Sequence, residues 1–290
     1  MDLCNINEIK SLLARHGFRF SKSMGQNFLI ADWVPREIAQ ASGACAEVGV
    51  LEVGPGIGCL TRELAQRARD TVAVELDRSL LPILEETLAD YRQDVHVISG
   101  DILKMDISQL VQEHLAPYSE LAACGNLPYN ITTPVITALI ESGCFSVITV
   151  MVQKEVAQRI CAQPGGKDYG AFSVYCQYHT RPELLFEVPP ECFIPAPKVT
   201  SAVVRMVASS PCGREELVDD PKHFFQVVRG AFALRRKTLA NSLSASLGGQ
   251  HTKEDVARAI ERCGLPPDVR GERLSIPQFA QLSRALRGLV

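Results

Sequence analysis

The chain has 290 residues, of which 46% are hydrophobic, and a formal net charge of −3. This length supports one large hydrophobic core and a smaller second domain. No apolar run approaches the roughly 18 residues of a membrane span, and the polar segment 1–10 lacks the features of a secretory signal. We therefore exclude a membrane-spanning class and expect a soluble, cytoplasmic protein.

The spacing of cysteine and histidine argues against disulfides and metal sites. The ten cysteines contain no C-x-x-C pair, and none of the six histidines lies four residues from another. Zinc sites and disulfide frameworks normally show such short, regular spacings. We predict reduced, mostly buried thiols and no bound metal.

Charge is distributed unevenly along the chain. Residues 1–209 hold 17 Lys and Arg against 24 Asp and Glu, whereas residues 210–290 hold 13 against 9. A basic module joined to an acidic one indicates a polyanionic partner. We expect two domains, 1–209 and 210–290, joined by the Ser-, Pro- and Gly-containing stretch 208–213.

The N-terminal residues predict a short helix over 6–16, followed by an arm that mixes cations with aromatic rings. Arg19, Phe20 and Lys22 belong to this arm. Cations can follow a phosphate backbone while rings offer surfaces on which bases stack, so Lys22 is a candidate nucleic-acid contact. The alternative is a plain arm packed on the domain.

The central motif is an apolar strand, 48–53, that runs into a glycine-rich turn. Gly54, Gly56 and Gly58 allow positive φ and let a ligand approach the backbone closely. The helical spacing after the turn completes the first strand-turn-helix unit of a doubly wound α/β fold. Cys59 stands where the dinucleotide fingerprint needs a further glycine, so that fingerprint is incomplete.

Carboxylates follow three consecutive strands of the predicted sheet. Glu52 lies on the first strand, Glu75 and Asp77 end the second, and Asp101 follows the third. The carboxyl ends of parallel strands meet at one edge, where ligands of open α/β sheets bind. Acids there would repel a pyrophosphate and suit a ligand with hydroxyls, an amine and a positive charge. The sequence predicts S-adenosylmethionine, unless these acids are only solvated loop ends.

Strand and helix patterns alternate and predict a parallel sheet with right-handed crossovers. Asp32 is the expected N-cap of a helix with Pro35 in its first turn. The prolines of segment 189–198 predict a rigid, extended loop. The expected strands are 48–53, 71–75, 95–99, 120–125, 147–152, 183–188 and 199–207, and the expected helices are 6–16, 32–41, 59–68, 79–90, 106–115, 133–142, 154–162 and 170–178.

The tetrapeptide Asn126-Leu127-Pro128-Tyr129 follows the fourth strand and suggests the chemistry. Because Pro128 has no N–H and favours an extended Leu127, the Leu127 carbonyl can remain free as an acceptor. With the side-chain oxygen of Asn126 it can hold the two hydrogens of an exocyclic amine, while Tyr129 stacks on the ring. We predict methyl transfer to a base amine, although the tetrapeptide alone also fits an ordinary turn.

Beyond residue 210 only helical spacing occurs, which predicts a small all-helical domain. Ser275 is expected to cap the last helix, with Pro277 in its first turn. Arg235, Arg236 and Lys237 are the best candidates for RNA contact. Placed on a helix, they cannot share one face, so one or two would reach phosphate. A solvated helix surface is the alternative.

Together these motifs resemble the ribosomal RNA adenine N6-dimethyltransferase family, and most closely its small-subunit 16S branch. The glycine turn is shared by many methyltransferases, whereas the combination is specific. The resemblance implies a Rossmann-like S-adenosylmethionine-dependent methyltransferase sheet with a small all-helical C-terminal domain that binds RNA or the ribosome. The matching segments are Gly25–Leu29, Glu52–Gly58, Val74–Asp77, Gly100–Asp101, Asn126–Asn130, Gln153–Val156, Phe193–Val199 and Arg235–Leu239.

The resemblance also implies a substrate and the residues that serve it. Two adjacent adenosines in a hairpin near the 3′ end of 16S rRNA would each receive two methyl groups during assembly of the small (30S) subunit. We also expect the protein to be a monomer. The implied cofactor contacts are Asn27 and Leu29 of the arm, Glu52, Gly54 and Gly56 at the glycine turn, Glu75 at the ribose hydroxyls, Asp101 at the adenine amine, and Asn126 near the methyl group.

Three alternatives stay open. The related resistance methyltransferases modify large-subunit RNA by the same chemistry, although segment 193–199 and the three tail cations favour the small-subunit branch. An adenine-specific DNA methyltransferase would need a base-reading element, which is not evident. A binding protein that acts as an assembly checkpoint would not need Glu75, Asp101 and Asn126 intact.

Overall fold

The structure is a computed structural model that describes residues 1–20, 25–210, 216–247 and 251–288. Lys22 therefore lies outside the described residues. By its internal contacts the chain divides into two compact units. The first comprises Met1–Ala157 and Glu183–Ala208, and the second comprises Gln158–Pro182 and Ser209–Val290.

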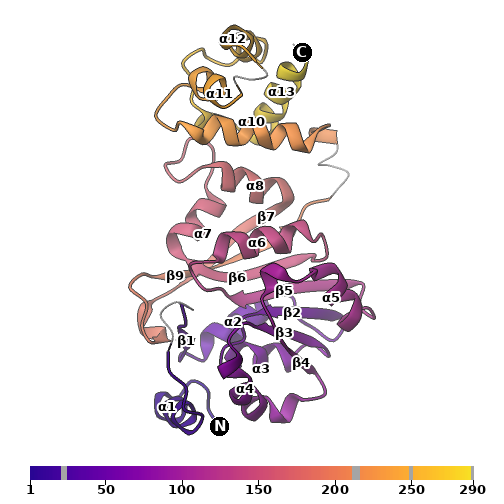
Figure 1. Cartoon of the computed structure of the whole chain (residues 1–290), viewed down its shortest axis with the longest axis vertical. Coiled ribbons are helices and arrows are strands. Elements are labelled where there is room, and N and C mark those ends of the chain that lie inside the picture. The colour runs from indigo at the N-terminus through magenta and orange to yellow at the C-terminus, as the bar shows by residue number, and fades with distance from the viewer. Residues whose placement is uncertain (21–24, 211–215, 248–250, 289–290) are drawn as a thin grey trace. The chain divides into compact units, whose positions relative to one another are not determined.

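Within the described residues, a seven-stranded sheet runs in the order β4-β3-β2-β5-β6-β9-β7 (Figure 1). The first five strands in this order are parallel, which confirms the predicted α/β sheet. β9 instead runs antiparallel to β6, with Val204 opposite Val150. The strands are β2 (Val48–Val53), β3 (Thr71–Glu75), β4 (Val95–Ser99), β5 (Glu120–Asn126), β6 (Val147–Gln153), β7 (Thr180–Val188) and β9 (Ser201–Ala208).

The helices between these strands lie within a few residues of their predicted positions. Asp32 occupies the N-cap position of α2 as expected, but its side chain makes no capping bond and pairs with Arg36 at 3.1 Å instead. The helix expected over 79–90 is shorter, because 3-10 turns replace both of its ends. The helices are α1 (Ile6–Arg15), α2 (Trp33–Ala41), α3 (Cys59–Ala65), α4 (Leu81–Thr87), α5 (Ile107–His114), α6 (Thr132–Glu141) and α7 (Lys154–Cys161).

A second, two-stranded sheet fixes the N-terminal arm. β1 (Phe28–Leu29) pairs antiparallel with β8 (Phe193–Ile194), so the arm lies beside the proline-rich loop. The backbone N–H of Ile30 extends this pairing by donating to the Cys192 carbonyl at 2.9 Å. The pairing was not predicted, since strands of two residues carry no readable alternation. It holds the arm at the edge of the pocket described below.

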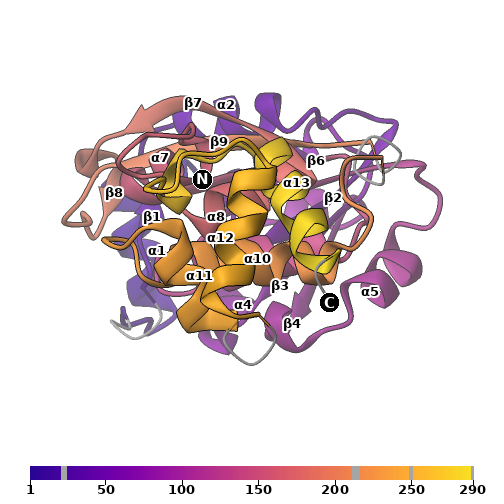
Figure 2. The ribbon, with the colours of Figure 1, turned by 90° about the horizontal axis from the view of Figure 1, so that it is seen from above.

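The second unit is mainly helical (Figure 2). It has its own hydrophobic core. Phe224 and Phe279 are fully buried in this core, and so is Tyr169, whose hydroxyl donates to the Leu274 carbonyl at 3.1 Å. Segment Gln158–Pro182 therefore packs with this unit, although the sequence placed it in the first domain. The helices are α8 (Ala171–His179), α10 (Pro221–Ala233), α11 (Leu239–Leu247), α12 (Lys253–Arg262) and α13 (Ile276–Arg287).

The last helix, α13, begins as the sequence predicts. The Ser275 side chain accepts the backbone N–H of Gln278, and Pro277 occupies the first turn. Of the helices that the structure describes, none combines the length and the apolar character needed to cross a bilayer.

Candidate active site

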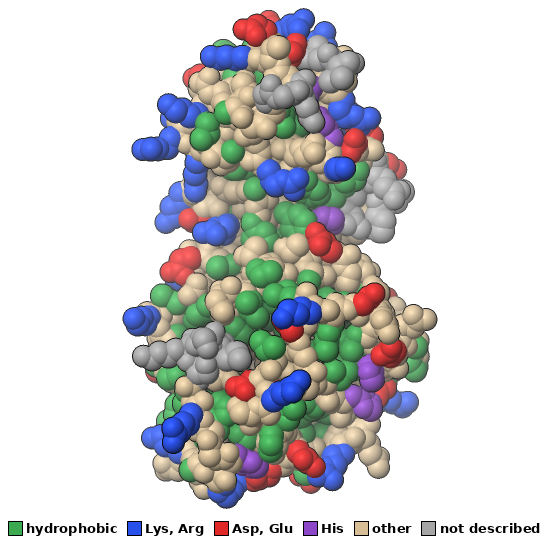
Figure 3. All heavy atoms as spheres, in the orientation of Figure 1, with side chains coloured by type: hydrophobic (Ala, Val, Ile, Leu, Met, Phe, Trp, Pro, Cys, Tyr) green, Lys and Arg blue, Asp and Glu red, His purple; other side chains and the backbone are tan. Residues whose placement is uncertain are grey.

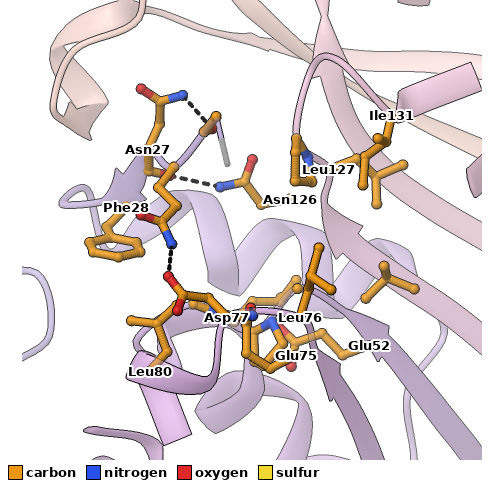
Figure 4. A pocket seen from close by; sticks show the side chains of 18 of the residues that line it. Asn27, Phe28, Glu52, Glu75, Leu76, Asp77, Leu80, Asn126, Leu127 and Ile131 are labelled. Carbon is orange, nitrogen blue, oxygen red and sulfur yellow. Dashed lines mark hydrogen bonds between the residues drawn. The ribbon is translucent and has the colours of Figure 1, made fainter. Parts of the chain in front are cut away.

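A pocket opens at the carboxyl ends of β2, β3 and β5, where ligands of open α/β sheets bind (Figure 4). Its walls come from four parts of the first unit: arm residues 25–29, the glycine turn after β2, the ends of β3 and β4, and segment 126–131 after β5. All the cofactor and catalytic residues expected from the sequence therefore line one cavity.

The three glycines of the turn have different reasons to be glycine. All have positive φ, +73° at Gly54, +61° at Gly56 and +93° at Gly58. A Cβ on Gly56 would lie 3.3 Å from the Phe28 ring, and one on Gly58 would lie 3.1 Å from Thr87 Oγ1. A Cβ on Gly54 would meet no atom within 4 Å. The turn therefore leaves open space beside Gly54, whereas protein side chains lie close to the Cβ positions of the other two glycines.

The pocket is strongly acidic. Among the described residues that line it, four are carboxylic acids, Glu52, Glu75, Asp77 and Asp101, and none is Lys, Arg or His. Such a lining disfavours phosphate groups and favours a cationic ligand. This arrangement agrees with the expectation of a positively charged cofactor.

Glu75 is held rigidly at the end of β3. Its side chain is 6% exposed, and its oxygens accept the backbone N–H of Gly56 at 3.1 Å and of Asp77 at 2.8 Å. Burial raises the pKa of Glu75, and these N–H groups partly oppose that rise. The carboxylate keeps lone pairs free for hydroxyl donors of a ligand.

Glu52 is more deeply buried and less well satisfied. It is 1% exposed, and its Oε2 has no hydrogen-bond partner among the described residues. Burial raises its pKa to about 8. An unpaired buried carboxyl is costly, so a ligand that supplies a donor or a positive charge would relieve it. The orphaned oxygen, the open space at Gly54 and the acidic lining together fit S-adenosylmethionine.

Asp77 and Asp101 also have local structural roles. Asp77 accepts the backbone N–H of Ser79 at 2.9 Å and the Gln26 amide at 2.6 Å. Burial by itself would raise the pKa of Asp77, but these hydrogen bonds outweigh that effect and keep the pKa below its ordinary value. Asp101 accepts the backbone N–H of Leu103 at 3.1 Å and lies 3.4 Å from Lys104 Nζ. Both acids line the pocket, but each also contacts other groups of the protein.

The Asn126 side chain has a fixed orientation. Its Nδ2 donates to the Asn27 carbonyl at 3.1 Å, so the arm holds the amide (Figure 4). The Leu127 N–H donates to the Met151 carbonyl of β6 at 3.1 Å. No described residue donates to Asn126 Oδ1 or to the Leu127 carbonyl. Both predicted acceptors are thus available at the pocket.

Tyr129 completes the segment with a ring anchored at its hydroxyl. The hydroxyl lies 2.7 Å from Ser201 Oγ, on the first residue of β9. Burial raises the pKa of Tyr129, which keeps the phenol neutral and able to hydrogen bond. The ring itself is half-buried and lines the pocket.

The arm contributes more to the pocket than the sequence indicated. Asn27 lines it and donates its Nδ2 to the Gly25 carbonyl at 3.1 Å, and Leu29 is buried in β1. Phe28 was not predicted as a site residue, yet its ring packs on the glycine turn. Its only sequence signal was its place inside the Gly25–Leu29 motif. Cys59 is a buried residue of α3 whose Sγ contacts the Leu29 carbonyl at 3.6 Å.

The cations that precede residue 21 are partly paired. Arg15 and His16 both contact Glu86, the latter at 2.7 Å. Phe20 is 41% exposed and packs edge-on against Phe18. For this part of the chain, these contacts favour an arm packed on the domain over an arm whose cations are free to contact nucleic acid.

The predicted RNA-contacting cations lie in the turn between α10 and α11, so placing them on a helix was wrong. α10 ends at Ala233, and the Leu234 N–H donates to the Ser242 hydroxyl at 3.0 Å. This side-chain bond replaces the next helical one and lets the chain turn. The three cations are exposed there: Arg235, Arg236 and Lys237.

These cations differ in how they are held. Arg235 bonds the Lys167 carbonyl and lies 3.4 Å from Glu272. The side chains of Arg236 and Lys237 make no hydrogen bond or ion pair with any residue that the structure describes, although the backbone N–H of Lys237 donates to the Leu234 carbonyl at 2.8 Å. Figure 3 shows Lys and Arg side chains gathered over the helical unit on the visible face. Lys22, the fourth candidate, lies outside the described residues.

Similarity to known proteins extends over nearly the whole chain. The ribosomal RNA adenine dimethylase family matches residues 17–284. Proteins named ribosomal RNA small subunit methyltransferase A from Geobacillus thermodenitrificans and Streptococcus pneumoniae are 45% and 43% identical to this chain over 290 residues. Each alignment covers 99% of this chain, and 98% and 99% of those proteins.

Solved structures give a similar picture. The 23S rRNA methyltransferase ErmE is 26% identical, with a TM-score of 0.65 over 90% of this chain and 100% of its own. A dimethyladenosine transferase from Plasmodium falciparum is 22% identical, with a TM-score of 0.73 over 88% of this chain and 95% of its own. The second likeness shows the fold alone.

Proposed function

Because the chain belongs to the ribosomal RNA adenine dimethylase family, we propose that it methylates N6 of two adjacent adenosines in the 3′-terminal hairpin of 16S rRNA. The products are N6,N6-dimethyladenosines formed during small-subunit biogenesis. The chain is an S-adenosylmethionine-dependent rRNA methyltransferase, and the resemblance noted in its motifs is confirmed. The names of the relatives at 43% and 45% identity support the small-subunit target.

The acidic pocket beside the Asn126–Tyr129 segment is the observation that carries this proposal. S-adenosylmethionine supplies an electrophilic methyl group on a positively charged sulfur. An acidic lining that contains no Lys, Arg or His among its described residues suits that charge, and the space at Gly54 admits a ligand against the backbone. The residues that we propose hold the cofactor are Asn27, Leu29, Glu52, Gly54, Gly56, Glu75, Asp101 and Asn126.

The available acceptors explain how an adenine amine becomes a nucleophile. Its lone pair is conjugated with the ring, so the free amine is a poor nucleophile. Asn126 Oδ1 and the Leu127 carbonyl can hold its two hydrogens out of the ring plane and localise the lone pair. Pro128 keeps Leu127 extended, and Tyr129 stacks on the base. Positioning and matched electrostatics provide the acceleration, and the nitrogen loses its proton after the methyl has transferred.

We further propose 16S rRNA within the 30S subunit as the partner of a monomeric, cytoplasmic enzyme. The side chains of Arg236 and Lys237 are exposed and unpaired among the described residues, which suits contact with phosphate. Arg235 would contribute while it holds the turn, and Lys22 would add a contact from the arm.

The test is incubation of the protein with methyl-labelled S-adenosylmethionine and unmodified small subunits, followed by mapping of the modified nucleotides. We expect two dimethylated adenosines in the 3′-terminal hairpin. Isolated large subunits and duplex DNA serve as competing acceptors. Label on large-subunit RNA or DNA, with none on small subunits, would contradict the proposed substrate.

A further inference from the structure

A hydrogen bond joins the tetrapeptide to a strand that lies two positions away in the sheet. The Tyr129 hydroxyl lies 2.7 Å from Ser201 Oγ, and either oxygen can donate. Ser201 is fully buried and opens β9, where it pairs with Gln153 at the end of β6. Tyr129 and Ser201 are 72 positions apart in sequence.

The support under this bond is rigid. The end of β6 is fixed to β5 through the Leu127 N–H, which donates to the Met151 carbonyl at 3.1 Å. It is also fixed to the start of β9, because the Lys154 N–H donates to the Thr200 carbonyl at 3.0 Å. The backbone under Tyr129 and the hydroxyl of Ser201 therefore keep a constant separation. The Tyr129 ring is held at both ends, by its Cα and by its hydroxyl.

A ring held in this way has a defined plane. Without the partner hydroxyl, the side chain of Tyr129 could turn about its χ angles, because it is only half-buried. We propose that Ser201 is a positioning residue for methyl transfer, which acts by fixing the Tyr129 ring as the stacking surface for the target adenine. This inference rests on the proposed function and adds a residue to its machinery.

The plane of the base matters because the direction of the nitrogen lone pair depends on it. Asn126 and Leu127 fix the amine, but two acceptors at one end still allow the base to tilt about them. A stacking surface in a set plane removes that freedom and keeps the lone pair directed at the methyl group. Ser201 thus affects the rate of transfer and leaves binding of the cofactor unchanged.

The experiment is a double-mutant cycle with Ser201→Ala, Tyr129→Phe and the combined variant. Single-turnover methylation of small subunits is measured at saturating concentrations of both substrates. Each single variant should be about three- to tenfold slower, the value of one hydrogen bond. The combined variant should be no slower than either one, since both changes remove the same bond. Dissociation constants for S-adenosylmethionine should stay within about twofold of wild type.

Ser146→Ala is the matched control. Ser146 Oγ donates to the Leu121 carbonyl at 3.1 Å, just before β6 begins at Val147, so this variant also loses a hydroxyl hydrogen bond of the sheet. It should transfer methyl groups at the wild-type rate. Losses that multiply in the combined variant, or full activity of Tyr129→Phe, would overturn the inference. If Ser201→Ala fails to fold, Tyr129→Phe alone decides. A wild-type protein without activity would instead contradict the proposed function.

Discussion

The acidic pocket and the α10–α11 turn carry the proposed function in different ways. In the pocket, Glu75 is 6% exposed and bonded to two backbone N–H groups, and Asn126 is fixed by the arm. In the turn, the side chains of Arg236 and Lys237 are exposed and have no partner in the described part of the chain. The pocket is thus organised before a ligand arrives, whereas under the proposed function these cations would acquire partners only from the RNA.

This difference separates the expected effects of substitution. Changes in the pocket should reduce chemistry or cofactor binding and leave binding of small subunits intact. Changes in the turn should weaken binding of small subunits and leave chemistry and cofactor binding intact. Arg235 is intermediate, because its contacts with Lys167 and Glu272 also stabilise the helical unit.

The largest effect is expected for Asn126→Ala. Loss of an acceptor that acts on the reacting amine should slow methyl transfer by about a hundredfold to a thousandfold, as for other positioned transition-state contacts. Single-turnover rates measure this, while binding to small subunits should change less than threefold. Asn126→Asp should be similarly impaired, because a carboxylate would face the Asn27 carbonyl. A variant without the amide that methylates at the normal rate would refute the amine-positioning argument.

Glu52→Gln should remove a pH dependence of stability that belongs to the pocket. Glu52 has a folded pKa of about 8 against an ordinary value of 4.5, so the unfolded chain ionises first as the pH rises. Its contribution to stability is complete below about pH 4.5 and is lost as the pH rises to about 8, by at most about 5 kcal/mol. Denaturant titration of the ligand-free protein at pH 5 and pH 8 measures this. We expect Glu52→Gln to be the more stable protein at pH 8 and similar at pH 5.

Glu75→Gln should weaken cofactor binding by about tenfold to a hundredfold. An amide would turn a donor toward the N–H of Gly56 or Asp77 and remove a negative charge from the pocket. Calorimetric titration with S-adenosylmethionine measures the loss. Binding to small subunits should remain at the wild-type level, and unchanged cofactor affinity would remove Glu75 from the binding site.

The combined change Arg236→Gln with Lys237→Gln should weaken binding to small subunits by about tenfold at moderate salt. The slope of log affinity against log salt concentration should also become less steep, by the amount that one to two phosphate contacts contribute. Cofactor affinity should not change. Lys253→Gln with Arg262→Gln is the matched control, because these exposed cations of α12 carry equal charge at another place. Equal losses in both pairs would indicate net charge rather than a defined contact.

The sequence predicted the parts of the fold that depend on local pattern. β3 and β4 occupy the expected residues 71–75 and 95–99, and the turn after β2 has its glycines at positive φ. Buried parallel strands leave continuous apolar runs, and carboxylates at their ends are readable as a group. For this reason the acids and the tetrapeptide could be placed around one pocket without coordinates.

Other features depend on contacts that no local pattern encodes. The pairing of β1 with β8 joins segments more than 160 residues apart through two residues each. The bond between Tyr129 and Ser201 is of the same kind. Segment Gln158–Pro182 packs with the helical unit through Tyr169, which its sequence alone does not indicate. The three cations leave the helix because the Ser242 hydroxyl captures a backbone N–H.

Cofactor binding over the Gly54 turn is tested most directly by two matched glycine substitutions. Gly54 and Gly43 have φ of +73° and +76°, and a Cβ on either would meet no protein atom within 4 Å, but only Gly54 lines the pocket. Each change to Ala should cost about 1–2 kcal/mol of stability through backbone strain. Calorimetric titration with S-adenosylmethionine should show at least tenfold weaker binding for Gly54→Ala and wild-type binding for Gly43→Ala. Equal, wild-type affinity in both variants would contradict the account.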